Sequence, residues 1–254
     1  MVEPERALFL HTLPNSLPAG ITRMYAGAEF CPWRLPDLAT LRHMLNWARA
    51  NRCAFTLATP VLIEPRRAEF TRLLSALLPE FAETDELAIS DWGVLELARA
   101  AAPDVTLVVG RALSGQKRDP RTPALDFDAT ELMHFRSSSW HAAPAVAMLQ
   151  DLGITRVELD NLWQGLEPLP APLRGTLHTP YAMVASSRNC PFHAAGSAEP
   201  CPQPCGEVFS LHRDDFPSPL LQGGNTQFIR IPHLPPNLSA CRIDRVVEHL
   251  DLPH

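Results

Sequence analysis

The chain has 254 residues, of which 46% are hydrophobic and 20% charged, so it can bury a core and is not a disordered protein. The net charge is −6, which disfavours a large RNA partner because tight nucleic-acid binding needs a basic face. No run of 18 apolar residues occurs, and the first residues, MVEPERALFLHTLPNS, place acidic side chains before a short apolar stretch. We therefore expect a cytoplasmic protein without a secretory signal or a membrane span.

The first two thirds of the chain alternate between short apolar runs and longer amphipathic segments. Residues 23–27 are predicted to form a first strand, and apolar residues at helical spacing predict a helix over 35–50, capped by Asp37. Residues 53–59 follow as a strand buried on both faces. The pattern then predicts a helix over 67–78, a strand over 86–89, a helix over 92–101 with Asp91 before it, a strand over 105–109, an edge strand over 130–135, a helix over 141–152 closed by Gly153, and a strand over 156–159.

The last third has a different character, because 14 of the chain's 26 prolines lie from residue 168 onward. Proline removes a backbone donor and disfavours helices, so this third is predicted to be mainly strands and stiff loops. The dense stretches are 168–180, 200–204, 217–219 and 232–236. Strands are predicted at 176–178, 183–184, 207–209 and 226–231, and a closing helix at 241–250.

Strand-then-helix alternation indicates βαβ units and a parallel sheet. Several such units in succession predict an α/β fold of the (β/α) TIM-like barrel type, partial or distorted. We predict one domain over 1–254, with βα repeats in 1–165 and a Cys-rich, Pro-rich segment in 166–254 that supplies the closing strands and helix. Working residues of barrels lie just past the strand ends, and Cys31 has that position after the first strand.

Three of the six cysteines lie within sixteen residues, as Cys190-x10-Cys201-x3-Cys205. Prolines stand directly beside them and would hold the thiols in place. A disulfide framework suits small secreted chains, and structural zinc prefers paired knuckles, although His193 could join such a site. An iron–sulfur cluster tolerates irregular spacing and a remote ligand, for which Cys31 is the natural candidate. Spacing alone leaves these three interpretations open.

The segment from His178 to Cys190, HTPYAMVASSRNC, combines a histidine, a run of small apolar residues and a Ser-x-Arg-x-Cys turn. It resembles the signature of the collagenase-like peptidase family U32. The turn Gly27-Ala28-Glu29-Phe30-Cys31 and the late pair Cys201 and Cys205 resemble other cysteine positions of that family. Residues 91–94 (DWGV) and 110–113 (GRAL) look like its middle strand-end turns, so the likeness runs from about residue 23 to 231.

The resemblance implies a partial or distorted barrel that binds a [4Fe-4S] cluster through Cys31, Cys190, Cys201 and Cys205. It further implies a redox subunit of an oxygen-independent hydroxylase in anaerobic ubiquinone biosynthesis, paired as a heterodimer with a second member of the family. A quinone precursor and prephenate, the oxygen source, would be its small molecules. Some relatives hydroxylate RNA bases instead, and peptidase activity is not expected because no Ser/His/Asp set stands out. The rival hypothesis is a non-enzymatic protein with a structural metal site.

The catalytic residues cannot be assigned from the sequence, but five side chains at apparent strand ends are candidates for lining a pocket: Glu29, Asp91, Arg111, His178 and Arg188. His178 also has a structural interpretation as a hydrogen-bonded histidine at a strand end, and Arg188 as a loop-fixing arginine. Cys53, inside an apolar run, is interpreted as a small core residue. Cys241 is expected at the start of the closing helix.

Overall fold

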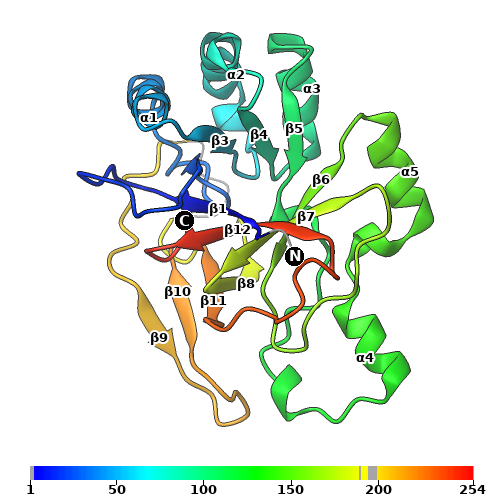
Figure 1. Ribbon diagram of the computed structural model, residues 1–254. Helices are drawn as coiled ribbons and strands as arrows, with labels where there is room; N and C mark the ends of the chain where they lie inside the picture. Colours follow the sequence, from blue (N-terminus) through cyan, green and yellow to red (C-terminus); the bar gives the residue numbers. More distant parts are fainter. Residues whose placement is uncertain (1–2, 189, 194–198, 254) are drawn as a thin grey trace.

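The computed structural model describes residues 3–188, 190–193 and 199–253, and its centre is a closed barrel of parallel strands (Figure 1). The barrel strands are β1 (Glu5–Phe9), β2 (Arg23–Gly27), β3 (Ala54–Ala58), β4 (Glu86–Ile89), β5 (Thr106–Val109), β6 (Arg156–Asp160), β7 (Arg174–Thr179) and β12 (Ile243–His249). They follow one another around the barrel in chain order, and β1 closes the ring against β12. The predicted α/β TIM-like fold is confirmed.

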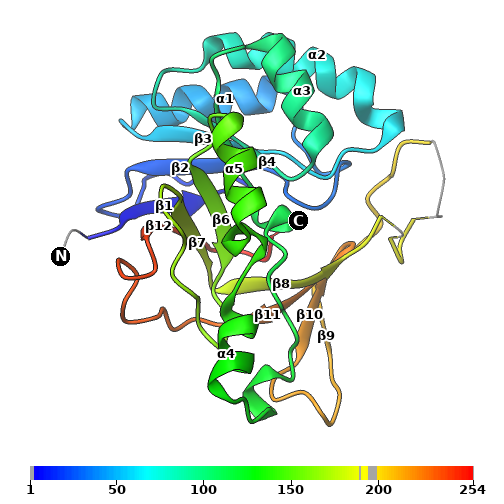
Figure 2. The ribbon, with the colours of Figure 1, turned by 90° about the vertical axis from the view of Figure 1, so that its right-hand side faces the viewer.

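The helices are α1 (Leu38–Ala50), α2 (Arg67–Leu77), α3 (Trp92–Ala101), α4 (Ala129–Arg136) and α5 (Ala143–Asp151). Asp37 and Asp91 cap α1 and α3 by accepting hydrogen bonds from backbone N–H groups of the first turns. Helices α1, α2 and α3 lie side by side over the strands from β2 to β4 (Figure 2). The outer ring is irregular, because no helix follows β1 or β6 in the described part of the chain.

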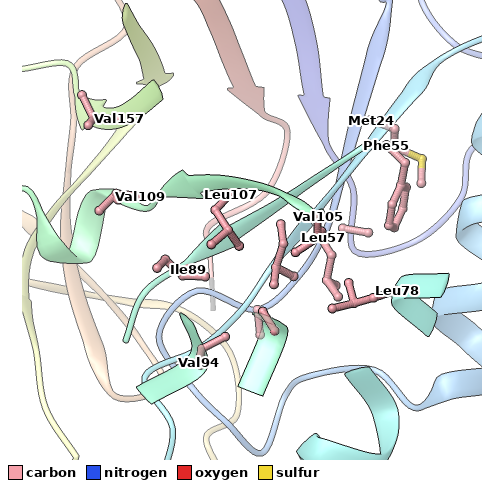
Figure 3. Packing of buried hydrophobic residues seen from close by; sticks show 14 of the residues in the cluster. Met24, Phe55, Leu57, Leu78, Ile89, Val94, Val105, Leu107, Val109 and Val157 are labelled. Atoms are coloured by element: carbon pink, nitrogen blue, oxygen red, sulfur yellow. The ribbon is translucent and has the colours of Figure 1, made fainter. Parts of the chain in front are cut away.

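Apolar side chains on the outer face of the barrel form the main core. Phe55, Leu57, Leu87 and Ile89 are fully buried and pack beneath the helices with residues such as Val94 (Figure 3). Burying one side chain of this size contributes about 1.5–3 kcal/mol relative to exposure. Cys53 belongs to this core, as its apolar surroundings predicted.

Polar residues occupy many of the alternate, inward-facing positions of the same strands. Near the amino-terminal ends, Arg245 donates to Glu86 at 2.6 Å and to Glu5 at 2.6 Å, and Arg23 donates to Glu5 at 3.0 Å. Because the barrel interior excludes water, each buried charge needs such a partner. The strands are therefore buried on both faces, although only the outer face is apolar throughout.

A second sheet is inserted between β7 and β12. Its antiparallel strands are β8 (Tyr181–Ser186), β9 (Phe209–Leu211), β10 (Leu220–Gly223) and β11 (Thr226–Arg230), in the order β8-β11-β10-β9. Phe228 of this sheet packs on Phe30, Met183 and Leu252, which join it to the carboxyl end of the barrel. The prolines of the last third thus accompany a small antiparallel sheet.

Several predicted elements need correction. Residues 130–135 belong to helix α4, because Asp128 and Glu131 form a capping box. The predicted closing helix over 241–250 is strand β12, whose alternating side chains face the barrel interior and the outer core. Strands β1 and β10 were not predicted. No helix in the described ranges is long and apolar enough to cross a membrane.

Candidate metal centre and barrel mouth

The turn after β2 carries two of the candidate residues. Gly27 has a φ of +118°, and a Cβ at this position would collide with the carbonyl oxygen of Ala58. Glycine therefore allows the chain to leave the barrel in a tight turn against β3. This turn places Glu29 in the barrel mouth and Cys31 in an adjoining cavity.

All four predicted ligand cysteines line one cavity of about 260 Å³. Cys31 comes from the turn after β2, Cys190 from the loop after β8, and Cys201 with Cys205 from the segment before β9. Their neighbours in the wall include Phe30, Trp33, Arg34, Met183, Arg188 and Phe192. The structure thus brings together thiols that are up to 174 positions apart in the sequence.

Hydrogen-bond donors surround these thiols. Arg34 Nη2 donates to Cys205 Sγ at 3.1 Å, and the backbone N–H of Gln203 donates to Cys201 Sγ at 3.4 Å. Burial raises the pKa of Cys31, while hydrogen bonds from the backbone N–H groups of Trp33 and Arg34 counteract part of that effect. Such donors stabilise sulfur in its thiolate form, which is the form that binds metal.

The spacing of the thiols restricts the groups that they can hold. All six cysteines are free, so none forms a disulfide. Among the described residues, Glu29, His178 and His249 are the group whose ligand atoms all lie within 4.8 Å of one another, and no three cysteine sulfurs form such a group. Tetrahedral zinc, with Zn–S bonds of about 2.3 Å, would bring the thiolates to roughly 3.8 Å from each other. Four free thiols around one cavity are a donor set that suits zinc or an iron–sulfur cluster.

The five predicted pocket residues separate into three places. Arg188 is exposed and lines the cysteine cavity. Glu29, Arg111 and His178 lie together in the barrel mouth. Asp91 lies elsewhere: its carboxylate accepts from the backbone N–H of Gly93 at 2.7 Å and caps α3. Cys241, predicted as a helix start, is half-buried before β12 and is absent from the cavity wall.

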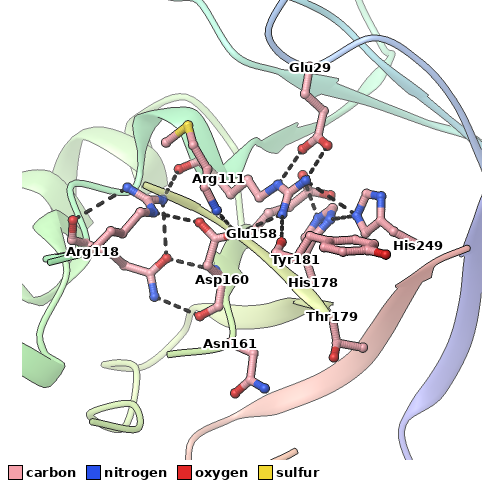
Figure 4. A network of polar contacts seen from close by, with 12 residues as sticks. Glu29, Arg111, Arg118, Glu158, Asp160, Asn161, His178, Thr179, Tyr181 and His249 are labelled. Carbon is pink, nitrogen blue, oxygen red and sulfur yellow. Dashed lines mark hydrogen bonds and ion pairs between the residues drawn. The ribbon is translucent and has the colours of Figure 1, made fainter. Parts of the chain in front are cut away.

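Arg111 is the centre of the mouth and is completely buried (Figure 4). Its guanidinium donates to both oxygens of Glu29, at 2.6 and 2.7 Å, to Asp160 Oδ1 at 2.7 Å and to the carbonyl of Tyr181 at 2.8 Å. Arg118 donates to the second oxygen of Asp160 at 2.6 Å. Burial raises the pKa of Asp160, but Arg118 and Arg111 outweigh it, so the net shift is downward and the carboxylate stays ionised.

Two histidines and a glutamate complete the mouth. His178 Nδ1 lies 2.8 Å from His249 Nε2, and His178 Nε2 lies 3.2 Å from Glu158 Oε2 (Figure 4). The contact between His178 Nε2 and Glu158 is close enough for an ion pair, but its geometry is not that of a hydrogen bond. Burial lowers the pKa of His249 well below its usual range, and the charges of Arg111 and His178 add to this effect.

Sequence reasoning missed Asp160, His249, Glu158 and Arg34. Arg156, Glu158 and Asp160 alternate with the apolar residues Val157 and Leu159 along β6, and this period of two was a signal for an inward polar face. His249 was hidden because its segment was assigned to a helix. No sequence signal links Arg34 to Cys205, since 171 positions separate them.

Comparisons with known proteins found one structural similarity. No family model and no curated protein matches the sequence. One solved structure, described as the U32 peptidase Mk0906, aligns with a TM-score of 0.49 and 12% sequence identity, covering 99% of this chain and 94% of that one.

Proposed function

We propose that the protein binds a [4Fe-4S] cluster through Cys31, Cys190, Cys201 and Cys205. The observation that carries this proposal is the convergence of four free thiols from three distant segments on one cavity. When bound, such a cluster would supply one-electron transfer, with a potential set by burial and hydrogen bonds to sulfur. With four thiolate ligands, no iron would be left open for a substrate.

The residues around the cysteines suit this role. Phe30, Met183 and Phe192 contribute an apolar wall that would limit access of water. Arg34 and the backbone N–H groups of Trp33 and Arg34 provide donors to sulfur. Gln203 Nε2 donates to the Trp33 carbonyl at 2.9 Å and thereby joins the early and late cysteine segments. These contacts would pre-orient the ligands, a task that supporting residues perform in many metal sites.

Metal analysis of anaerobically purified protein tests the proposal. We expect about four iron atoms with matching acid-labile sulfide per chain and a brown colour that dithionite bleaches. One zinc ion per chain without colour would support the rival, a structural metal site in a non-enzymatic protein. Protein that contains neither metal would contradict both interpretations.

For the reaction, we propose the role of the ubiquinone biosynthesis protein UbiV: a redox subunit of an oxygen-independent hydroxylase that works with a UbiU-like partner as a heterodimer. Support comes from the cysteine-containing turns at Gly27–Cys31 and His178–Cys190, which resemble the U32 family. The substrates would be a quinone precursor and prephenate, and the net charge of −6 disfavours RNA.

Quinone profiles of a gene-deletion strain grown without oxygen test this role. We expect the loss of one ring hydroxylation under anoxia and a normal profile in air. Unchanged quinones together with an unhydroxylated RNA base would instead establish the alternative function of an RNA-base hydroxylation factor. Copurification of a second cysteine-rich chain from the wild-type strain would identify the partner.

A further inference from the structure

The barrel mouth contains a buried chain of three titratable groups that the proposed cluster site does not use. It consists of Glu158 on β6, His178 on β7 and His249 on β12, and we call it the histidine relay. Each of the three side chains is at most 3% exposed. Glu158 Oε1 and His249 Nδ1 make no hydrogen bond within the part of the chain that the structure describes. Buried polar atoms of this kind are uncommon and point to exchange of protons or water.

The charges around the relay favour one proton on it. In the mouth, two guanidinium groups, Arg111 and Arg118, face three carboxylates, Glu29, Asp160 and Glu158. One additional positive charge balances this set, and unbalanced buried charge is costly. The ion pairs near the amino-terminal end of the barrel involve separate partners, with Arg245 and Arg23 on Glu5 and Glu86.

The geometry indicates where that proton resides. If His178 carries both ring protons, Nε2 faces the carboxylate of Glu158 and Nδ1 donates to His249 Nε2 at 2.8 Å. The lone pair of His249 Nε2 then also faces Arg111 Nη2, which lies 3.5 Å away. If His178 is neutral and carries its hydrogen on Nε2, His249 Nε2 must donate the hydrogen of the 2.8 Å contact to His178 Nδ1, and the Arg111 N–H that also faces His249 Nε2 then has no lone pair to meet. The protonated relay is therefore the consistent arrangement.

Arg111 also argues against a metal ion in the barrel mouth. Glu29, His178 and His249 are grouped like ligands of a metal ion. However, Arg111 Nη2 lies 2.6 Å from Glu29 Oε2 and 3.5 Å from His249 Nε2, so a fixed cation already stands between these ligands. A divalent ion would have to displace a guanidinium that holds four acceptor atoms. Proton exchange needs no such displacement.

Arg111 and Phe30 connect the relay to the wall of the cysteine cavity. Glu29 and Arg111 each precede a residue of the cavity wall, Phe30 and Ala112. The Arg111 guanidinium lies 5.3 Å from the centre of the Phe30 ring. Phe30, Glu29 and Arg111 are each at most 2% exposed, so no bulk water screens a change of charge in the cavity from the relay.

We propose that the histidine relay takes up one proton for each electron delivered to the cysteine cavity. This inference rests on the proposed cluster. A one-electron donor protein supplies the electron, solvent supplies the proton, and one N–H bond forms on the His178–His249 pair. Reoxidation reverses both transfers. The added electron raises the proton affinity of the relay. Electron and proton uptake are therefore coupled at pH values where the relay of the oxidised protein has begun to lose its proton.

Several charged or titratable groups face the relay from the surrounding strands and set that pH. Glu158 and Asp160 act from β6 and Tyr25 from β2, with its ring centre 5.9 Å from that of His178. Arg111 and His11 act on His249. Since the carboxylates favour the protonated relay and Arg111 opposes it, removal of Glu158 is expected to lower the pH at which the proton is lost.

Two measurements on the anaerobically isolated, oxidised protein test the inference together. Nitrogen-15 NMR of histidine-labelled protein should reveal one imidazolium that is lost at a defined pH. It should be absent from His178→Gln, released at lower pH in Glu158→Gln and unchanged in His43→Gln, a variant of an exposed histidine on α1. The midpoint potential of wild type should become pH-dependent at that same pH, with one proton per electron, and His178→Gln should remove this dependence.

The outcomes separate the two proposals. Iron-free protein would refute the proposed cluster, and this inference would fall with it. A wild-type potential that stays constant while the NMR signal shows proton loss would overturn the inference and leave the cluster intact. An NMR spectrum without a relay imidazolium would overturn it as well. These wild-type measurements decide the matter even if a relay variant does not fold.

Discussion

Arg34 shows how one side chain can act on a distant ligand. It belongs to the turn that follows Cys31, yet its guanidinium donates to the sulfur of Cys205 at 3.1 Å. A charge-assisted hydrogen bond of this kind stabilises thiolate and is stronger than a neutral one. Arg34 therefore links the early ligand segment to the late one.

We predict that Arg34→Gln weakens retention of the metal group about 10–100-fold, the usual range for a supporting residue of a metal site. The readout is iron per chain after anaerobic dialysis against a mild chelator. Arg72→Gln, on the exposed face of α2, is the matched control and should behave as wild type. Equal iron retention in both variants would show that the Arg34–Cys205 contact has no influence on binding.

A second residue-scale prediction concerns Arg111. Arg111→Met leaves Glu29 and Asp160 without their common cation, which should cost about 3–5 kcal/mol of unfolding free energy at neutral pH. Arg121→Met removes a largely exposed partner of Asp119 and should cost no more than about 1 kcal/mol. Urea unfolding measures both.

The pH dependence of this loss has a definite sign. The net shift of the Asp160 pKa in the folded protein is downward, despite its burial, because Arg118 and Arg111 stabilise the carboxylate. Its contribution to stability is thus present above the unfolded pKa of about 3.9 and is lost as pH falls through the lower folded value. The difference between wild type and Arg111→Met should shrink below about pH 4. A constant difference across pH would contradict this electrostatic explanation.

At the scale of elements, the turn after β2 depends on a residue without a side chain. Gly27→Ala places a Cβ against the Ala58 carbonyl in a backbone conformation that also disfavours alanine. We expect it to cost clearly more unfolding free energy than Gly153→Ala, where φ is +70° and a Cβ would meet open space, and which should cost about 1 kcal/mol. Comparable losses in the two variants would argue against the collision at Ala58.

The sequence predicted where helices begin more reliably than whether an isolated segment is a strand or a helix. Asp37 was recognised as a cap, because apolar residues at helical spacing follow it. Asp91 was placed directly before its helix but was predicted to line a pocket, whereas it caps α3. Strand β12 was mistaken for a helix, since its pairing partners, β1 and β7, are remote in sequence and no local pattern reveals them. Its residue His249 was lost from the predicted site for the same reason.

At the scale of the whole molecule, the barrel closes through contact between the two ends of the chain. Strand β1 pairs with β12 and β2, and Glu5 of β1 pairs with Arg23 and Arg245. The alternation of strands and helices predicted a barrel, but closure depends on partners 240 positions apart, which no local pattern reveals. The convergence of the cysteines on one cavity likewise follows from the tertiary fold.

We predict that deletion of residues 1–9 opens the barrel, because β2 and β12 lose their shared neighbour and two buried arginines lose Glu5. Size-exclusion chromatography and urea unfolding should show aggregation and loss of a cooperative transition. Deletion of residues 1–3, which precede β1, serves as the control and should leave both properties unchanged. A monomeric, cooperatively unfolding product of the longer deletion would contradict this view of closure.

The most direct test of the central claim is a comparison of iron content in anaerobically purified Cys31→Ser and Cys53→Ser. Both changes replace one cysteine in the first quarter of the chain, but only Cys31 lines the cavity with the three late cysteines. Joint ligation by four thiolates predicts that Cys31→Ser loses its iron and colour, whereas Cys53→Ser retains about four irons per chain. Full iron content in Cys31→Ser would contradict the proposed metal centre.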